Sequence, residues 1–214
     1  LLIFTSDNGG MMNRGGQHAV ASGHKINGDL LGFKFDSWEG GHRVPMIVRW
    51  PGVVEAGTKT DQLISNVDML HSLASLMGYE LQEGDGPDSY NMLPVLLGTT
   101  DEELRDHLVI AAFKPANIGF REGNWMYISS RGGGGFSARN PGDHGFGGPP
   151  ALKYAGEVNS DIEDGKFKPD APDQQLYNLA VDLTESTNLV REYPDKAEQM
   201  KQRLREIREA ASSR

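Results

Sequence analysis

Residues 1–10 read LLIFTSDNGG, and this stretch decides the fold. Its apolar start is typical of a parallel strand covered on both faces, and open α/β sheets bind ligands just beyond the carboxyl ends of such strands. Asp7 and Asn8 follow the apolar run directly, and Gly9-Gly10 permits a bend that lets both side chains converge on one ion. A carboxylate beside an amide oxygen favours Ca²⁺ or Mg²⁺ over zinc. The alternative is an Asx turn without a metal, which the same Asp-Asn-Gly sequence also forms.

The next segments predict the closing half of an α/β layer. Residues 11–43 are rich in Gly, His and Asn and indicate a long loop over the sheet edge. Residues 44–50 form a second apolar strand, which Pro51-Gly52 ends. A helix follows, with Ser65 or Asn66 as its N-cap and Gly78 at its C-terminal end. We expect its apolar stripe to be core; the stripe consists of Leu63, Val67, Leu70, Ala74 and Met77.

The character of the chain changes after a loop-like stretch over residues 79–107. Strands are predicted at 108–113, in a hairpin at 118–121 and 125–129 around Glu122-Gly123-Asn124, and at 175–179. A helix over 194–211 packs on this antiparallel sheet, with Pro194 in its first turn. Residues 131–150 hold eight glycines and three prolines, which predicts a flexible loop; a Gly-rich phosphate cradle lacks the strand-to-helix context it needs.

The domain organisation follows from these elements. The fold class is α/β, with an α/β sheet part at residues 1–107 and an antiparallel subdomain with a packed helix at residues 108–214. Because the chain starts at Leu1 inside a strand, we expect it to be the C-terminal portion of a larger protein, whose missing N-terminal part is then its first partner.

Composition excludes several classes of function. A net charge of −9 argues against a nucleic-acid partner, because phosphate binding needs clustered Lys and Arg. No stretch approaches the roughly 20 apolar residues of a membrane span. With no cysteine among 214 residues, the chain has no disulfide, no thiolate metal site and no cysteine nucleophile.

Four motifs together carry a resemblance to a known family. They are Asp7-Asn8-Gly9-Gly10, Gly23-His24-Lys25, Lys34 to Pro45 with its Trp-Glu-Gly-Gly segment, and Ile47 to Gly52. In this order they closely resemble the second half of type I, formylglycine-dependent sulfatases of the arylsulfatase kind, in the alkaline phosphatase superfamily. Further landmarks extend the resemblance to nearly the whole chain except residues 131–172. It implies the C-terminal part of an alkaline-phosphatase-like α/β domain.

The resemblance also implies site residues. Asp7 and Asn8 would be two ligands of a single Ca²⁺ that holds and polarises a sulfate group, and the other ligands, an Asp pair and the formylglycine hydrate, would lie upstream of this chain. Two oxygens do not complete a calcium shell of roughly 6 to 8. Lys34 falls where the family has a catalytic lysine that contacts sulfate oxygens, and Glu39 and Arg43 are expected to form a structural ion pair.

Histidines in the long loop are candidate substrate ligands. His24 and His42 lie where they could bind substrate or protonate a leaving alkoxide, although the family's catalytic histidines lie upstream. His71, His107 and His144 are expected to have no part in the site.

The family's nucleophile motif, Cys or Ser followed by x-Pro-x-Arg, is absent from the chain. Ser6, the serine nearest the expected metal site, precedes Asp7-Asn8-Gly9-Gly10 instead. The resemblance therefore predicts sulfuric ester hydrolysis by a longer enzyme and an inactive isolated chain. Phosphate or phosphonate ester hydrolysis by a relative in the same superfamily, or a non-catalytic fragment, are the alternatives. The identity of the sulfate ester and the localisation stay open.

Overall fold

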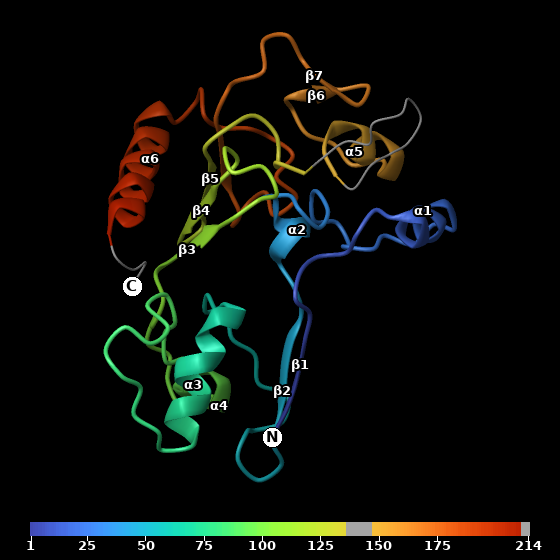
Figure 1. Cartoon of the computed structure of the whole chain (residues 1–214). Helices are drawn as coiled ribbons and strands as arrows, with labels where there is room; N and C mark the ends of the chain where they lie inside the picture. The colour runs from blue at the N-terminus through green and yellow to red at the C-terminus, as the bar shows by residue number, and fades with distance from the viewer. Residues whose placement is uncertain (136–146, 211–214) are drawn as a thin grey trace. The chain divides into compact units, whose positions relative to one another are not determined.

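The computed structural model describes residues 1–135 and 147–210 (Figure 1). The chain divides into two compact units. Unit 1 comprises Leu1–Ser6, Pro45–Leu108 and Leu204–Arg214, and unit 2 comprises Asp7–Val44 and Val109–Arg203. Asp7 is thus the first residue of unit 2, and every residue predicted for the active site lies in that unit.

Unit 1 contains the two strands that precede and follow the predicted long loop. β1 (Leu2–Thr5) pairs antiparallel with β2 (Met46–Arg49), and Leu2 lies opposite Arg49. The prediction of a parallel strand covered on both faces is wrong within the described residues, because β1 has this antiparallel neighbour and Phe4 is 60% exposed. A continuous apolar run indicates a strand but does not identify its partner.

The helical part of unit 1 begins at Asn66, directly after Ser65, one of the two predicted N-cap residues. A 3-10 turn, η1 (Asn66–Asp68), leads into α3 (Met69–Leu76), and the flanking Ser65 N–H donates to Asp68 Oδ2 at 2.8 Å. A short helix, α4 (Leu93–Leu97), follows within the predicted loop. Ala74 is buried as expected, but the rest of the stripe is not core: Val67 is 52%, Leu70 48% and Met77 74% exposed. Helical spacing reveals an apolar face without showing what covers it.

A buried ion pair orders the long connection between α3 and the second half of the chain. Arg105 Nη2 lies 2.5 Å from Asp68 Oδ1, and Arg105 Nε donates to Asp68 Oδ2 at 3.1 Å. The same guanidinium lies over the Tyr90 ring, 4.2 Å from its centroid. Both partners are almost inaccessible to solvent, so this forked contact satisfies two charges that would otherwise be costly to bury.

The second half forms the predicted small antiparallel sheet. Its strands run in the order β3 (His107–Ile110), β4 (Gly119–Glu122), β5 (Trp125–Ile128) and β8 (Gln175–Asn178). β4 and β5 form the expected hairpin, in which Gly123 takes the positive φ of 55° that its two-residue turn requires. The α/β class with an antiparallel sheet and a C-terminal helix is therefore confirmed.

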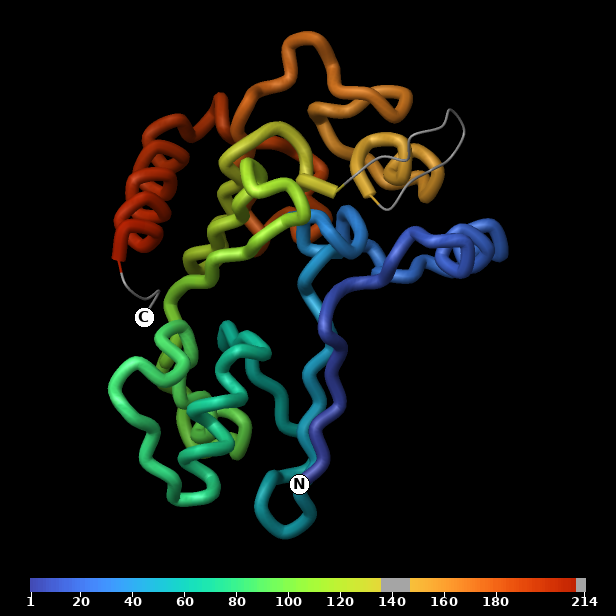
Figure 2. The backbone as a smooth tube through the Cα atoms, viewed as in Figure 1, coloured from blue at the N-terminus to red at the C-terminus, as the bar shows by residue number. Residues whose placement is uncertain are grey.

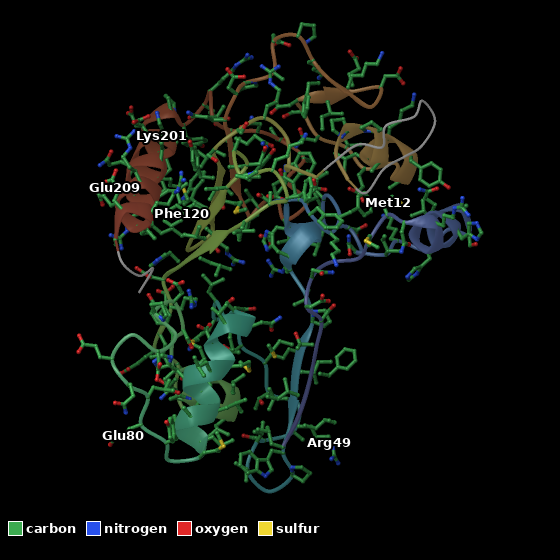
Figure 3. The ribbon with its side chains drawn as sticks, viewed as in Figure 1. Met12, Arg49, Glu80, Phe120, Lys201 and Glu209 are labelled. Carbon is green, nitrogen blue, oxygen red and sulfur yellow. The ribbon has the colours of Figure 1, made fainter. Side chains whose placement is uncertain are left out.

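The C-terminal helix packs as predicted. α6 (Pro194–Glu209) starts at Pro194 and buries Ala197 and Met200, while Lys201 lies on its outward side (Figure 3). Trp125 of β5 contacts Tyr193 just before the helix, with ring centroids 5.5 Å apart. Ala211, predicted as the last residue of the stripe, lies outside the described residues.

Several helices and strands were not predicted because their local sequence lacks the usual pattern of such elements. The predicted loop 11–43 contains α1 (Arg14–Ala21) and α2 (Glu39–His42), and Asn13 caps α1 by accepting the Gly16 N–H at 3.0 Å. Glycines in the first turn of α1 obscure its helical pattern. Figure 2 shows the chain leaving the Asp7–Gly10 segment through α1 and returning before α2. The other missed elements are α5 (Pro149–Ala155), β6 (Ile162–Glu163) and β7 (Lys166–Phe167).

The division at residue 107 stays a prediction. Of the predicted flexible loop 131–150, residues 136–146 lie outside the described residues.

Candidate active site

One pocket of unit 2 collects most of the predicted site residues. Asp7, Asn8, Lys34 and His42 line a cavity of about 370 Å³. The rest of its wall is formed by Phe35, Asp36, Gly41, Ala111, Ala112 and Phe113. Residues that are 35 positions apart in the sequence thus face the same space, which supports their assignment to one site.

Backbone hydrogen bonds join the segment that carries Asp7 and Asn8 to the segments that carry Lys34 and His42. Gly9 N–H donates to Gly41 O at 3.0 Å, and Lys34 N–H donates to Gly10 O at 2.9 Å. A Cβ on Gly9 would lie 1.8 Å from Gly40 O, and one on Gly41 would lie 2.1 Å from Asp36 O. These glycines are therefore required for close backbone approach, which explains why both predicted motifs carry Gly-Gly.

Asp7 and Asn8 present hard oxygen ligands but not a complete metal site. Asn8 Nδ2 donates to Gly9 O at 2.9 Å, which orients the amide and makes Oδ1 the atom suited to a cation. Among residues 1–135 and 147–210 no group of three or more His, Cys, Asp or Glu is arranged to hold a metal ion. The donor chemistry of this pair fits Ca²⁺, and further oxygens are needed to complete its shell.

Lys34 is held in place by an unusual backbone conformation. The next residue, Phe35, has a φ of +87°, which costs a bulky side chain about 1 to 3 kcal/mol and persists only where the surroundings impose it. Phe113 N–H donates to Phe35 O at 3.0 Å, and the two rings meet edge to face at 5.8 Å. Lys34 Nζ lies 5.4 Å from the Phe35 ring centroid. This contact limits the rotamers of Lys34 at the pocket wall.

His42 is a neutral acceptor in this pocket. Its Nε2 lies 3.0 Å from Ser37 O, and because a carbonyl can only accept, Nε2 carries the hydrogen and Nδ1 the lone pair. Burial lowers the pKa of His42. A neutral imidazole is a poor proton donor to a leaving group, so Lys34 is the cation of the pocket that is suited to charge stabilisation.

Asp36 is a pocket residue that the sequence did not reveal. Its carboxylate is buried and accepts N–H groups from Phe33 at 3.0 Å and Gly135 at 2.8 Å. Burial raises its pKa to about 6 despite these hydrogen bonds. A Cβ on Gly135 would lie 2.4 Å from Asp36 Oδ1, and one on Gly133 would lie 2.8 Å from Asp36 Cβ. The described part of the Gly-rich segment is thus a cradle for a carboxylate rather than for a phosphate.

The predicted structural ion pair is confirmed. Arg43 Nη1 lies 2.7 Å from Glu39 Oε2, and Arg121 Nη1 lies 4.0 Å from the same oxygen. Glu39 is fully buried, and its backbone N–H donates to Glu185 Oε2 at 2.7 Å. A charge cluster at α2 therefore fixes the segment that carries His42.

His24 lies in a different pocket. With Lys25 and Glu157 it lines a cavity of about 490 Å³. Glu157 Oε2 accepts the Gly32 N–H at 2.8 Å, and burial raises the pKa of Glu157 to about 8. Substrate contact by His24 stays a prediction, because the structure does not bring it to the pocket of Asp7 and Lys34.

Comparison with known proteins gives a consistent result. Residues 1–79 match the Sulfatase family model. The chain is 31% identical to an N-acetylgalactosamine-6-O-sulfatase of Bacteroides thetaiotaomicron over 97% of this chain and 36% of that protein. It is 38% identical to the steryl-sulfatase of Homo sapiens over 50% of this chain and 18% of that protein.

Solved structures agree with these relatives. A structure described in connection with the metabolism of multiple glycosaminoglycans by Bacteroides thetaiotaomicron superposes with a TM-score of 0.69 at 28% identity, covering 96% of this chain and 38% of that chain. A sulfatase from Pseudoalteromonas sp., at 18% identity and a TM-score of 0.63, shares the fold over 95% of this chain and 35% of that chain. The chain therefore spans little more than a third of these proteins.

None of the helices described within residues 1–135 and 147–210 is long and apolar enough to cross a bilayer.

Proposed function

This chain belongs to the sulfatase family, and from that premise we propose that a longer protein containing it hydrolyses sulfate esters at the pocket of Asp7, Asn8 and Lys34. The observation that carries the proposal is the convergence of two oxygen ligands and one ammonium group on a single cavity of about 370 Å³. A sulfate ester needs both kinds of group, because negative charge lies on its equatorial oxygens and grows on the leaving oxygen.

Asp7 and Asn8 would hold one Ca²⁺ in this protein, together with ligands from outside these 214 residues. When bound, the ion supplies Lewis-acid polarisation of the sulfate group. Lys34 contributes a point charge with three donors, which binds a sulfate oxygen and stabilises charge on the leaving oxygen. His42 contributes a lone pair on Nδ1, which suits a hydroxyl of the substrate.

The nucleophile must come from another part of the longer protein. The 214 residues include no cysteine and no Ser-x-Pro-x-Arg segment. We expect the isolated chain to be inactive, and we expect a formylglycine hydrate elsewhere in the protein to attack sulfur.

The substrate class is proposed to be a carbohydrate sulfate. The N-acetylgalactosamine-6-O-sulfatase aligns with 97% of this chain, whereas the steryl-sulfatase aligns with 50%. An alignment over 97% of the chain takes in nearly all of the segments that line the two pockets. Similarity across nearly the whole chain is a better guide to substrate than similarity over half of it.

Turnover of an aryl sulfate and an aryl phosphate by the longer protein, with and without a calcium chelator, tests the proposal. We expect faster sulfate turnover that the chelator abolishes. Lys34→Ala should lower kcat/KM by about 10² to 10³, whereas Lys153→Ala, at an exposed lysine paired with Asp164 and outside both pockets, should leave it nearly unchanged. Faster phosphate turnover would make the protein a phosphate ester hydrolase, and no turnover of either ester would favour a non-catalytic role.

A further inference from the structure

A single side chain, Asn27, joins two chain segments that carry pocket residues. Asn27 Oδ1 accepts the Gly10 N–H at 2.6 Å, and Asn27 Nδ2 donates to Gly32 O at 2.9 Å. Gly10 lies two residues after Asn8, and Gly32 lies two residues before Lys34. One amide thus links the segment with the proposed metal ligands to the segment with the proposed sulfate-binding lysine.

The two contacts use both halves of the Asn27 amide. A backbone N–H only donates and a backbone carbonyl only accepts, so Oδ1 must face Gly10 and Nδ2 must face Gly32. The opposite orientation would place two donors together at Gly10 and two acceptors together at Gly32. An alanine offers neither group, and an ionised aspartate offers only acceptors. A side-chain amide therefore satisfies both backbone groups at once.

The backbone around Asn27 is held by its own hydrogen bonds. Leu30 N–H donates to Asn27 O at 3.2 Å, and Gly28 N–H donates to Lys25 O at 3.1 Å. Gly28 has a φ of +62°, which a glycine adopts without strain. This turn limits the orientations that are open to the Asn27 side chain.

Both glycines that bind Asn27 contact further parts of the pocket. Gly10 O accepts the Lys34 N–H at 2.9 Å, so Gly10 is held through its N–H and its carbonyl. A Cβ on Gly10 would lie 2.7 Å from Asn27 Oδ1, and one on Gly40 of α2 would lie 2.2 Å from Gly32 O. Through these close approaches, Asn27 is connected to the segment of Lys34 and to α2.

Asn27 has these contacts without facing a ligand cavity. In the described part of the chain it lines neither the cavity of about 370 Å³ nor the cavity of about 490 Å³. We propose that Asn27 is a positioning residue of the active site, which sets the distance of the Lys34 ammonium group from Asp7 and Asn8. The two hydrogen bonds are properties of this chain, and their effect on turnover rests on the proposed function.

The distance matters because Lys34 and the metal half-site must act on oxygens of one sulfate group at the same time. A misplacement of about 1 Å in an active site can lower a rate by roughly 10²-fold. A shift that lets substrate bind but misaligns Lys34 with the leaving oxygen lowers kcat and leaves KM almost unchanged. Loss of the Asn27 amide should therefore act on kcat rather than on KM.

Kinetics of the longer protein with an aryl sulfate test the proposal. Asn27→Ala should lower kcat about 10- to 100-fold and change KM by less than about threefold. Asn27→Asp should also lower kcat, because its second oxygen repels Gly32 O. Asn13→Ala, the matched control, removes the α1 cap that accepts the Gly16 N–H at 3.0 Å and should leave kcat unchanged. Equal kcat values of Asn27→Ala and Asn13→Ala would overturn the proposal.

A double-mutant cycle with Lys34 separates positioning from a general loss of structure. If Asn27 acts through Lys34, Asn27→Ala should lower kcat by less than about threefold in a Lys34→Ala background, because the group that it aligns is already absent. The same fold-change in both backgrounds would contradict positioning, since independent effects multiply. Asn27→Asp keeps the size of the wild-type side chain and replaces Asn27→Ala in both kinetic comparisons if that variant does not fold.

Amide hydrogen exchange provides a readout that needs no turnover. In the longer protein, followed by mass spectrometry of peptides that cover Gly10, Asn27→Ala should raise the exchange rate of the Gly10 amide by about tenfold or more. Asn27→Asp, whose carboxylate still accepts this N–H, should not raise it. Unchanged exchange in Asn27→Ala would show that Asn27 does not hold Gly10. If the wild type does not hydrolyse the sulfate ester but the Gly10 amide responds as expected, the proposed function is wrong and the contacts of Asn27 stand.

Discussion

Replacement of Gly9 by alanine tests whether backbone approach builds the active-site pocket. The new Cβ would lie 1.8 Å from Gly40 O, and 2.8 Å and 3.0 Å from the carbonyl carbons of Gly40 and Gly41. Real Cβ atoms essentially never come within 3.0 Å of such atoms, so the two segments must separate by at least 1.2 Å (3.0 minus 1.8 Å). None of these atoms belongs to a flexible side chain that can rotate away.

Two effects set the expected change in the free energy of unfolding of Gly9→Ala. Overpacking of a closely packed region costs about 1 to 3 kcal/mol. The separation also breaks the Gly9 N–H to Gly41 O hydrogen bond of 3.0 Å, which contributes about 1 kcal/mol. We expect Gly9→Ala to lower the free energy of unfolding by roughly 2 to 4 kcal/mol, with a loss of order in the pocket of Asp7 and Lys34.

Urea unfolding of the chain, followed by tryptophan fluorescence, measures this difference. Gly15→Ala is the matched control, because a Cβ there meets only Asn13 Oδ1 at 3.3 Å and the residue lies in α1. Alanine is the better helix former by up to about 1 kcal/mol, which offsets its close contact with the Asn13 cap, so the control should stay within about 1 kcal/mol of the wild type. A Gly9→Ala variant within about 0.5 kcal/mol of the wild type would refute the steric reasoning, since that is the range of ordinary surface substitutions.

Three further outcomes are expected. Burial raises the pKa of Glu157 to about 8, so the free energy of unfolding of the wild type should fall as pH rises from 4.5 to about 8, by on the order of 1 kcal/mol per pH unit. Glu157→Gln should remove this contribution to the pH dependence. Unfolding free energies of variant and wild type that change in parallel with pH would contradict the prediction. Arg105→Met should cost roughly 3 to 5 kcal/mol in urea unfolding because it leaves Asp68 charged and buried, and adding Asp68→Asn should restore part of the loss. In the longer protein, calorimetry should show that Asp7→Ala lowers the affinity for Ca²⁺ at least tenfold, or by about 1.4 kcal/mol. Glu80→Ala, the control, should leave the affinity unchanged. Equal affinities of Asp7→Ala and the wild type would show that Asp7 is not a ligand of the ion.

Local sequence was enough to predict the elements whose signals are contained within them. The hairpin around Gly123-Asn124 and the helix from Pro194 were predicted because turn chemistry and helical periodicity act over a few residues. α1 was missed because glycines occupy its first turn, and α5 because Pro149-Pro150 ends the Gly- and Pro-rich stretch that was predicted as a flexible loop. Asn13 caps the start of α1, and Gly156 in the left-handed conformation ends α5.

The candidate site also contains residues that local sequence predicted and one that it did not. The motifs predicted Asp7, Asn8, Lys34 and His42, and the structure brings these four to one pocket while leaving His24 at another. Asp36 carried no local signal, because the Gly135 N–H that binds it lies 99 positions away. Sequence patterns do not encode contacts of that separation unless a motif records them.

The sequence by itself determined which chemical groups are available: two hard oxygen ligands, an ammonium group, no thiol, and glycines where two backbones must touch. Only the tertiary structure decided which of these groups meet in one pocket and which other side chains join them there. The contact of the Asp36 carboxylate with the Gly135 N–H spans 99 positions, and removal of this carboxylate from water raises its pKa to about 6. Burial is a property of the folded chain, and so the pKa values and the pocket arise with the fold.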